Sequence, residues 1–188
     1  MKTLSTLIWS TYIGGDSDDA AYVLAFSADQ SVLYVAGGTQ SDDFMTDYSD
    51  DGLMSGYQGG TADGFICKFQ NSGTYSLLTV TFVGTNSYDQ VYGIQVDKDN
   101  DVYVMGQTLG AFPVSDGVYS NAGSRQFLMK LDPDLGTNIY STVWGSGSTT
   151  MPNIVPVAFL VDTCENVYIS GWGGSIAGGS MTSPSYYE

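Results

Sequence analysis

The sequence has no histidine and few basic residues. Five Lys and Arg side chains stand against 20 Asp and Glu side chains, which gives a net charge of −15 and a pI near 4.1. Such a chain has no basic stripe with which to bind a phosphate backbone or an anionic membrane surface. The lack of histidine excludes Ser-His-Asp and Cys-His catalysis, and it removes the side chain that most often binds zinc, copper or iron.

Cysteines and long apolar runs are also scarce. The two cysteines are too few for the disulfide framework of a small secreted domain. Cys67 lies in an alternating apolar run and is predicted to be a buried free thiol, Cys164 is expected at a turn, and the sequence leaves their pairing open. The longest apolar stretch, residues 154–161, contains Pro156. It is far shorter than the roughly 20 residues of a membrane helix, so no membrane span is predicted.

The first ten residues do not resemble an export signal. They contain one Lys and lack an apolar core followed by a small-residue cleavage site. Two origins remain open, an intracellular protein or a piece of an exported precursor. We favour a secreted or cell-surface location, because the charged fraction is low and Gly, Ser, Thr and Tyr are abundant.

Internal repetition is the main signal in the sequence. Tyr34, Tyr103 and Tyr168 lie in register, at separations of 69 (103 − 34) and 65 (168 − 103) residues. Three copies of one unit are present, and the third is incomplete. The matching segments are 9–15 (WSTYIGG), 79–84 (TVTFVG) and 140–145 (YSTVWG); 33–38 (LYVAGG), 102–107 (VYVMGQ) and 167–172 (VYISGW); and 63–69 (DGFICKF) and 125–131 (RQFLMKL).

Each copy contains short runs that alternate apolar and polar residues and end at Gly, Asn or Asp, which predicts β-strands. Four such strands in a unit of this length are typical of a propeller blade. The expected strands are 8–13, 21–27, 32–37 and 64–69; 77–83, 91–97, 101–105 and 127–131; and 139–144, 157–162 and 166–171.

The predicted fold is therefore all-β, a partial β-propeller of four-stranded antiparallel blades. We treat residues 1–188 as a single propeller segment with fewer than three blades. Its blade-like repeats span approximately residues 7–73, 75–136 and 137–174, the last incomplete, and residues 175–188 form a tail.

At these residues the chain resembles the SBBP family of bacterial β-propeller repeats. The resemblance covers nearly the whole chain and departs after Gly174. It implies closed propellers of about seven blades, and the family has no assigned catalytic residues to transfer. The third copy, residues 156–174, resembles a variant in large surface proteins of Bacteroidetes that carry gliding-motility or type IX secretion domains. The other matching stretches include 9–15, 32–39 and 63–69 in the first copy, and 97–106, 111–113 and 127–133 in the second.

A propeller is stable because its blades pack face to face around a closed ring. Fewer than three blades leave both end faces open, so we expect something else to cover them. The candidates are further blades of a longer chain, identical copies of this chain, or a partner subunit. We favour a longer chain, because the third copy stops within the unit.

One acidic loop partly matches a calcium-binding pattern. Asp47, Ser49 and Asp51 precede Gly52 at alternate positions, but Gln58 takes the place of the usual twelfth-position Glu. Calcium here is a candidate cofactor, and a solvated acidic loop is the favoured alternative. The triplet Asp97, Asp99 and Asp101 also resembles a calcium motif, but its place in the repeat favours a hairpin turn.

The remaining candidates are acidic and aromatic. The acidic candidates lie after Gly-rich strand ends and are Asp16, Asp18, Asp19 and Asp89. Paired carboxylates can act as acid and base at a glycosidic bond. Because Asp19 and Asp89 occupy the same place in two copies, we favour carboxylates that accept backbone N–H groups. The aromatic candidates are the three tryptophans. Trp9 and Trp144 are expected to pack between blades, and Trp172 is a candidate for stacking on a sugar.

These observations favour a non-enzymatic scaffold for interaction or adhesion, with no predicted catalytic residue and no firm cofactor. Two alternatives stay open: a carboxylate-dependent polysaccharide hydrolase or lyase, and a self-assembling subunit of a ring or filament. The candidate partners are other blades, a glycan or a protein; nucleic acid is not among them.

Overall fold

A computed structural model describes residues 6–45, 52–147, 150, 152 and 154–173. These residues form ten β-strands and no helix, which confirms the predicted all-β fold class. Consequently the described part of the chain holds no helix of the length and apolarity needed to cross a bilayer.

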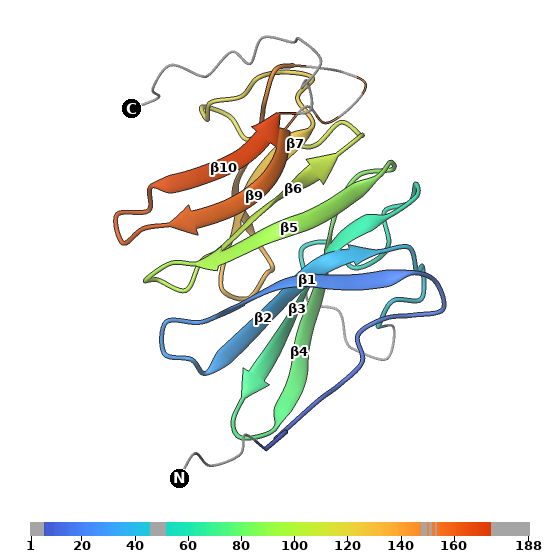
Figure 1. Cartoon of the computed structure of the whole chain (residues 1–188), viewed down its shortest axis with the longest axis vertical. Helices are drawn as coiled ribbons and strands as arrows, with labels where there is room; N and C mark the ends of the chain where they lie inside the picture. Colours follow the sequence, from blue (N-terminus) through green and yellow to red (C-terminus); the bar gives the residue numbers. More distant parts are fainter. Residues whose placement is uncertain (1–5, 46–51, 148–149, 151, 153, 174–188) are drawn as a thin grey trace.

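The strands form two four-stranded antiparallel sheets and one two-stranded sheet. Within each sheet, neighbouring strands follow one another along the chain (Figure 1). The first sheet contains β1 (Asp19–Phe26), β2 (Val32–Thr39), β3 (Asp63–Asn71) and β4 (Tyr75–Val83). The second contains β5 (Asp89–Val96), β6 (Val102–Thr108), β7 (Gln126–Leu131) and β8 (Asn138–Trp144), and the third contains β9 (Ile154–Val161) and β10 (Val167–Gly173).

Burial follows each strand's place in its sheet. The central strands β6 and β7 are buried along their whole length, and β2 and β3 along most of theirs. The first strand β1 alternates between half-buried and exposed residues. The central strands are therefore covered on both faces, and their buried residues include polar side chains such as Asp63, Gln126 and Lys130.

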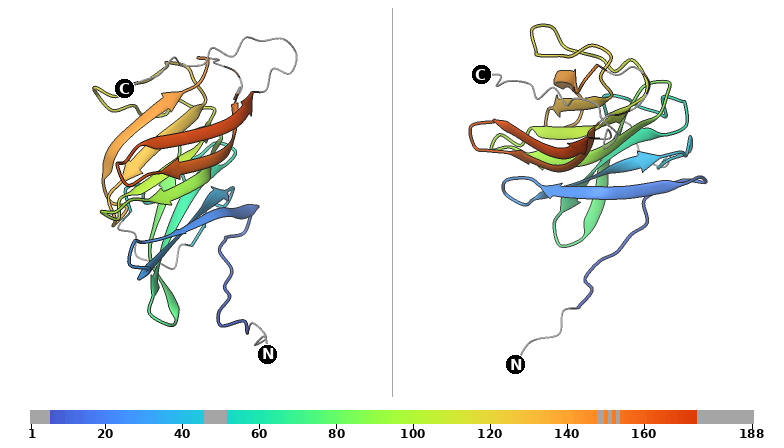
Figure 2. Two further views of the ribbon diagram at one scale, coloured as in Figure 1. Left: turned by 60° about the vertical axis from the view of Figure 1, so that its left-hand side comes forward. Right: turned by 45° about the horizontal axis from the view of Figure 1, so that its top comes forward.

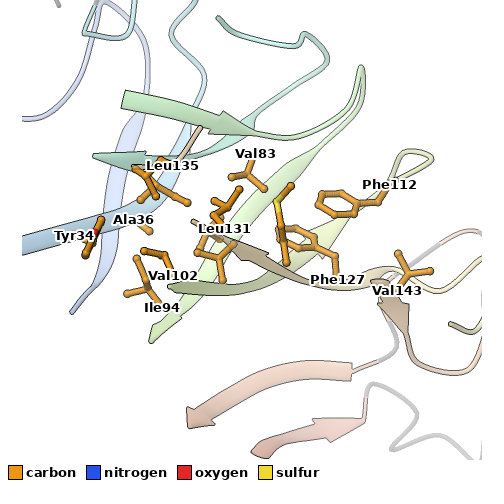
Figure 3. Close-up of a cluster of buried hydrophobic side chains, with 14 residues drawn as sticks. Tyr34, Ala36, Val83, Ile94, Val102, Phe112, Phe127, Leu131, Leu135 and Val143 are labelled. Atoms are coloured by element: carbon orange, nitrogen blue, oxygen red, sulfur yellow. The ribbon is translucent and has the colours of Figure 1, made fainter. Parts of the chain in front are cut away.

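The sheets stack in the order of the chain (Figure 2). The strand β5 contacts β1 and β2 of the first sheet on one side and β9 of the third sheet on the other. An apolar cluster fills the junction between the first and second sheets (Figure 3). Its buried members are Tyr34, Ala36, Ile66, Val83, Val91, Ile94, Val102, Val104, Phe112, Phe127, Met129, Leu131, Leu135 and Val143.

A second apolar cluster lies on the first sheet and includes Leu33, Val35, Phe65 and Cys67. Part of its cover comes from the preceding chain, because Trp9 and Ile13 pack against it. Cys67 is a buried free cysteine, as predicted, and its burial raises the pKa of the thiol. Cys164 is exposed at a turn, also as predicted, and is not disulfide-bonded in this structure.

The strand expected at residues 8–13 does not form, because no strand among the described residues pairs with it. The segment that opens each later repeat becomes the last strand of the sheet before it: β4 ends the first sheet and β8 ends the second. Sheet boundaries are therefore offset by one strand from the repeats at 7–73, 75–136 and 137–174. The third sheet keeps two strands, and the three sheets do not close into a ring.

The hairpins between the first and second strands of the sheets share a turn geometry. Gln30, Asn100 and Glu165 have positive φ angles of 61°, 69° and 67° at the same place in the three hairpins. In the second sheet, Asp97 Oδ1 accepts the N–H groups of Asp99 and Asp101 at 2.9 and 3.0 Å. The acidic triplet at 97–101 is thus a hairpin turn, in agreement with the favoured interpretation.

Candidate functional site

The candidate calcium ligands Asp47, Ser49 and Asp51 lie outside the described residues. Within the described part of the chain, no group of three or more Asp, Glu, Cys or His side chains is placed to hold a metal ion. The calcium interpretation of the 47–51 loop therefore stays a prediction.

The repeated carboxylates belong to turns. Asp19 Oδ2 accepts the N–H of Gly15 at 2.8 Å and the hydroxyl of Ser41 at 2.9 Å. Asp89 Oδ2 accepts the N–H and the hydroxyl of Thr85, both at 2.7 Å. The two sheets thus use the same bond at the same place, which confirms the structural role favoured for these residues. Asp16 and Asp18 lie beside this turn and are exposed.

A buried carboxyl pair lies where the first sheet meets the second. Asp63 and Asp89 are fully buried, and each has one oxygen, Oδ1, without a hydrogen-bond partner. Burial raises the pKa of Asp63 to about 7 despite a hydrogen bond from the Gln58 N–H, and the charge of Asp89 adds to the rise. The pKa of Asp89 is raised as well, also mainly by burial.

The buried carboxyl pair also explains why residue 84 is a glycine. A Cβ atom on Gly84 would lie 2.5 Å from Asp63 Oδ1 and 3.3 Å from Asp89 Oδ2, so any larger residue would collide with the carboxyl groups. Because both Asp side chains are closed off from solvent, the pair has no surface at which to meet a substrate. The pair is a buried structural contact in which each carboxyl disfavours ionisation of its neighbour.

A lysine joins the second sheet to the third. Lys130 Nζ lies 2.9 to 3.1 Å from carboxylate oxygens of Asp97, Asp101 and Glu165, and 4.8 Å from the centroid of the Tyr103 ring. Burial alone would lower the pKa of Lys130, but its hydrogen bonds raise it above the ordinary value. The equivalent Lys68 contacts Asp134, which is 86% exposed. The repeat therefore places a cation at each junction.

The three tryptophans differ in burial. Trp9 packs against the rings of Phe69 and Tyr75, with centroid separations of 5.9 and 4.6 Å. Trp144 is half-buried at the end of β8. In contrast, Trp172 is 53% exposed on β10.

Trp172 belongs to a continuous exposed surface, which we call the open face of the third sheet. Tyr168 and Trp172 lie an even number of positions apart on β10 and so face the same side of the sheet. Leu160 lies directly opposite Tyr168 on β9. All three side chains are more than half exposed. Tyr168 corresponds in the repeat to Tyr34 and Tyr103, both fully buried against the following sheet, so the open face lies where another sheet would pack.

The structure also reveals a cluster that the sequence analysis did not identify. Tyr22 and Tyr92, on β1 and β5, lie at matching β-bulges and stack with their centroids 5.4 Å apart. Gln90 Oε1 accepts hydrogen bonds from Tyr92 at 2.6 Å and from Tyr22 at 3.3 Å, and Tyr88 lies 3.0 Å from Tyr92, hydroxyl to hydroxyl. We call these four residues the inner-strand tyrosine cluster, where inner strand means β1 or β5, the first strand of each four-stranded sheet.

Bulges redirect side chains and are frequent beside functional sites. Tyr22 is 46% exposed, whereas Tyr88, Gln90 and Tyr92 are half-buried. The repeat contains a signal for the pair, because AYV at 21–23 corresponds to VYG at 91–93. That signal was not separable from ordinary strand alternation, since a bulge depends on the partner strand.

In a comparison with known families, residues 80–113 match the family model described as a beta-propeller repeat, SBBP. The matched stretch covers the end of β4, all of β5 and β6, and the start of the following loop. No curated protein matches the chain. The four-stranded antiparallel sheets and the family match together show a propeller-type segment whose sheets do not close.

Proposed function

We propose that the chain is part of a longer, secreted or cell-surface β-propeller and acts as a non-enzymatic scaffold for interaction or adhesion. The repeat match and the stacked sheets support the propeller. The low charged fraction and the abundance of Gly, Ser, Thr and Tyr support the location.

One observation carries the binding role, namely the inner-strand tyrosine cluster. Aromatic rings with hydroxyl groups offer both an apolar face and hydrogen bonds, which suits a glycan ligand. The hydrogen bonds from Tyr92 and Tyr22 to Gln90 hold the rings in place before any ligand arrives, so little side-chain entropy is lost on binding. Trp172 provides a second exposed ring on the third sheet.

A glycan array tests this proposal. We expect the full chain to bind a subset of glycans without cleaving them, and we expect Tyr22→Ala to weaken that binding about tenfold, the equivalent of about 1.4 kcal/mol. Trp172→Ala tests the second ring in the same assay. Tyr12→Ala is the matched control, because Tyr12 is a 98% exposed tyrosine that does not belong to the cluster.

The same samples distinguish the alternatives. Cleavage of a bound glycan that disappears in Asp47→Asn or Asp51→Asn would support the carboxylate-dependent hydrolase or lyase and contradict the scaffold. Unchanged binding in both Tyr22→Ala and Trp172→Ala would contradict the assignment of these rings to the ligand.

Self-assembly is favoured by a separate observation, the open face of the third sheet. Exposed apolar surfaces of this kind are typical of protein contacts. A discrete oligomer or a filament in light scattering would make assembly the leading function.

A further inference from the structure

The first described residues of the chain have the sequence of a sheet's outer strand but pair with no strand. Residues 9–14 match 79–84 and 140–145, which lie in or just after β4 and β8. Those two strands are the last strands of their sheets, at the edge opposite β1 and β5, and they pair with the third strands β3 and β7. We call this fourth position the outer strand. Residues 6–18, by contrast, form no strand (Figure 1).

The side chains of this segment already alternate as they would in an outer strand. Ile13 corresponds to Val83, and each packs on the apolar face of the sheet that follows it in the chain. Tyr12 corresponds to Phe82, whose side chain lies on the opposite face of β4. Phe82 is buried there, but Tyr12 is 98% exposed. The segment thus presents one side to the first sheet and leaves the other uncovered.

The link from this segment into β1 also repeats the link between two complete sheets. The N–H of Gly15 donates to Asp19 Oδ2 at 2.8 Å, as the N–H of Thr85 donates to Asp89 Oδ2 at 2.7 Å. In the second case this turn carries the chain from the outer strand β4 to the first strand β5. Residues 13–19 therefore have the geometry of an exit from an outer strand.

The first sheet is also incompletely covered. Leu24 on β1 corresponds to Ile94 on β5, since the bulged Tyr22 and Tyr92 are two residues before them. Ile94 is 3% exposed because the first sheet covers it, whereas Leu24 is 63% exposed. The surface around Leu24 thus lacks the cover that a preceding sheet would provide.

We propose that residues 9–13 form the outer strand of one further sheet of the same repeat, which stacks on the first sheet and covers Leu24. The three inner strands of that sheet lie outside residues 1–188, in a longer form of this chain. This inference rests on the proposal that the chain is a propeller segment, and it names the partner of its first face.

A second copy of the chain fits this place less well. Such a copy would offer the free edge of β10, which is the second strand of the third sheet among the described residues. The outer strands β4 and β8 pair instead with strands at the third position. The partner that fits is therefore a sheet whose third strand is present.

The test supplies the missing strands from the chain itself. Residues 89–137, which contain β5, β6 and β7, are joined to residue 7 of the full chain, because residue 137 precedes the segment that corresponds to residue 7 onward. Hydrogen exchange is then measured at the amides of residues 9–13. We expect exchange to slow by at least about tenfold relative to the unextended chain.

A matched control carries Ser10→Pro and Thr11→Pro in the same fusion. Adjacent strand residues direct their N–H groups to opposite edges, so one of the two prolines removes a pairing donor. We expect this control to exchange as the unextended chain does. As a second measurement, in a Cys164→Ser background, the thiol of Leu24→Cys should react more slowly in the fusion than in the unextended chain.

A second fusion, in which residues 19–76 precede residue 7, guards against poor folding of the first. The proposal is overturned if residues 9–13 exchange equally fast in both fusions and in the unextended chain. It is also overturned if the unextended chain gains protection at these residues as its concentration rises, since a second copy would then be the partner. The glycan-binding assay on Tyr22→Ala is independent of both results, so failure of the scaffold proposal remains distinguishable.

Discussion

The second sheet and the two sheets beside it share one sequence pattern but differ in cover. Ile94 in the second sheet is 3% exposed, whereas its counterpart Leu24 in the first sheet is 63% exposed. Tyr103 in the second sheet is 1% exposed, whereas its counterpart Tyr168 in the third sheet is 54% exposed. The same residue types are therefore core in the middle of the stack and surface at its ends, and the neighbouring sheet decides which.

The largest expected difference is between Ile94→Ala and Leu24→Ala. Removal of the buried Ile94 side chain should lower the free energy of unfolding by about 4 kcal/mol, because it leaves a cavity in the junction. The exposed Leu24 should change it by less than about 0.5 kcal/mol. Urea unfolding of both variants measures the difference, and equal losses would mean that Leu24 is covered in solution.

A second pair compares the lysines of the two junctions. Lys130→Met leaves the fully buried Asp97 carboxylate without its cation, so we expect a loss of about 3 kcal/mol in unfolding free energy. Lys68→Met breaks a contact with the exposed Asp134 and should cost less than about 1 kcal/mol. Similar losses in thermal and urea unfolding would contradict the different burial of the two junctions.

Asp63 gives a pH-dependent comparison. Its pKa is about 7 in the folded chain and near the ordinary 3.8 when unfolded, so the folded state holds the proton more tightly between these values. Its contribution to stability is therefore complete below about pH 4 and declines as the pH rises toward 7. We expect Asp63→Asn to gain stability relative to the unmodified chain over this window, as measured by urea unfolding at several pH values. A constant difference across the window would show that Asp63 does not titrate there.

The smallest perturbation compares the two thiols. Cys164 is exposed, whereas Cys67 is fully buried with a raised pKa. A thiol reagent should label one site per native chain and two after unfolding, as counted by mass spectrometry. Rapid labelling of Cys67 in the native chain would mean that the cluster on the first sheet opens readily.

The sequence predicted the strands and the repeat because both depend on local alternation. Tyr34, Tyr103 and Tyr168 could be aligned without a structure, and the turn role of Asp19 and Asp89 followed from their repetition. The burial of Cys67 likewise followed from its apolar strand neighbours.

What the sequence did not predict depends on neighbours in space. Residues 8–13 have strand alternation, but a strand needs a partner, and none is present among the described residues. The inner-strand tyrosine cluster required bulges in β1 and β5, which arise from the pairing with β2 and β6. The calcium candidates Asp47, Ser49 and Asp51 stay untested.

Hydrogen exchange of the intact chain tests most directly whether cover by neighbouring sheets distinguishes these regions. It compares the equivalent strands β2, β6 and β10 at the same time. We predict that β6 is the most protected, since its sheet is stacked on both sides, and that β10 is the least protected, since it forms an unpaired edge of the described third sheet and has an open face. Protection of β10 equal to that of β6 would contradict a dependence of burial on the neighbouring sheets.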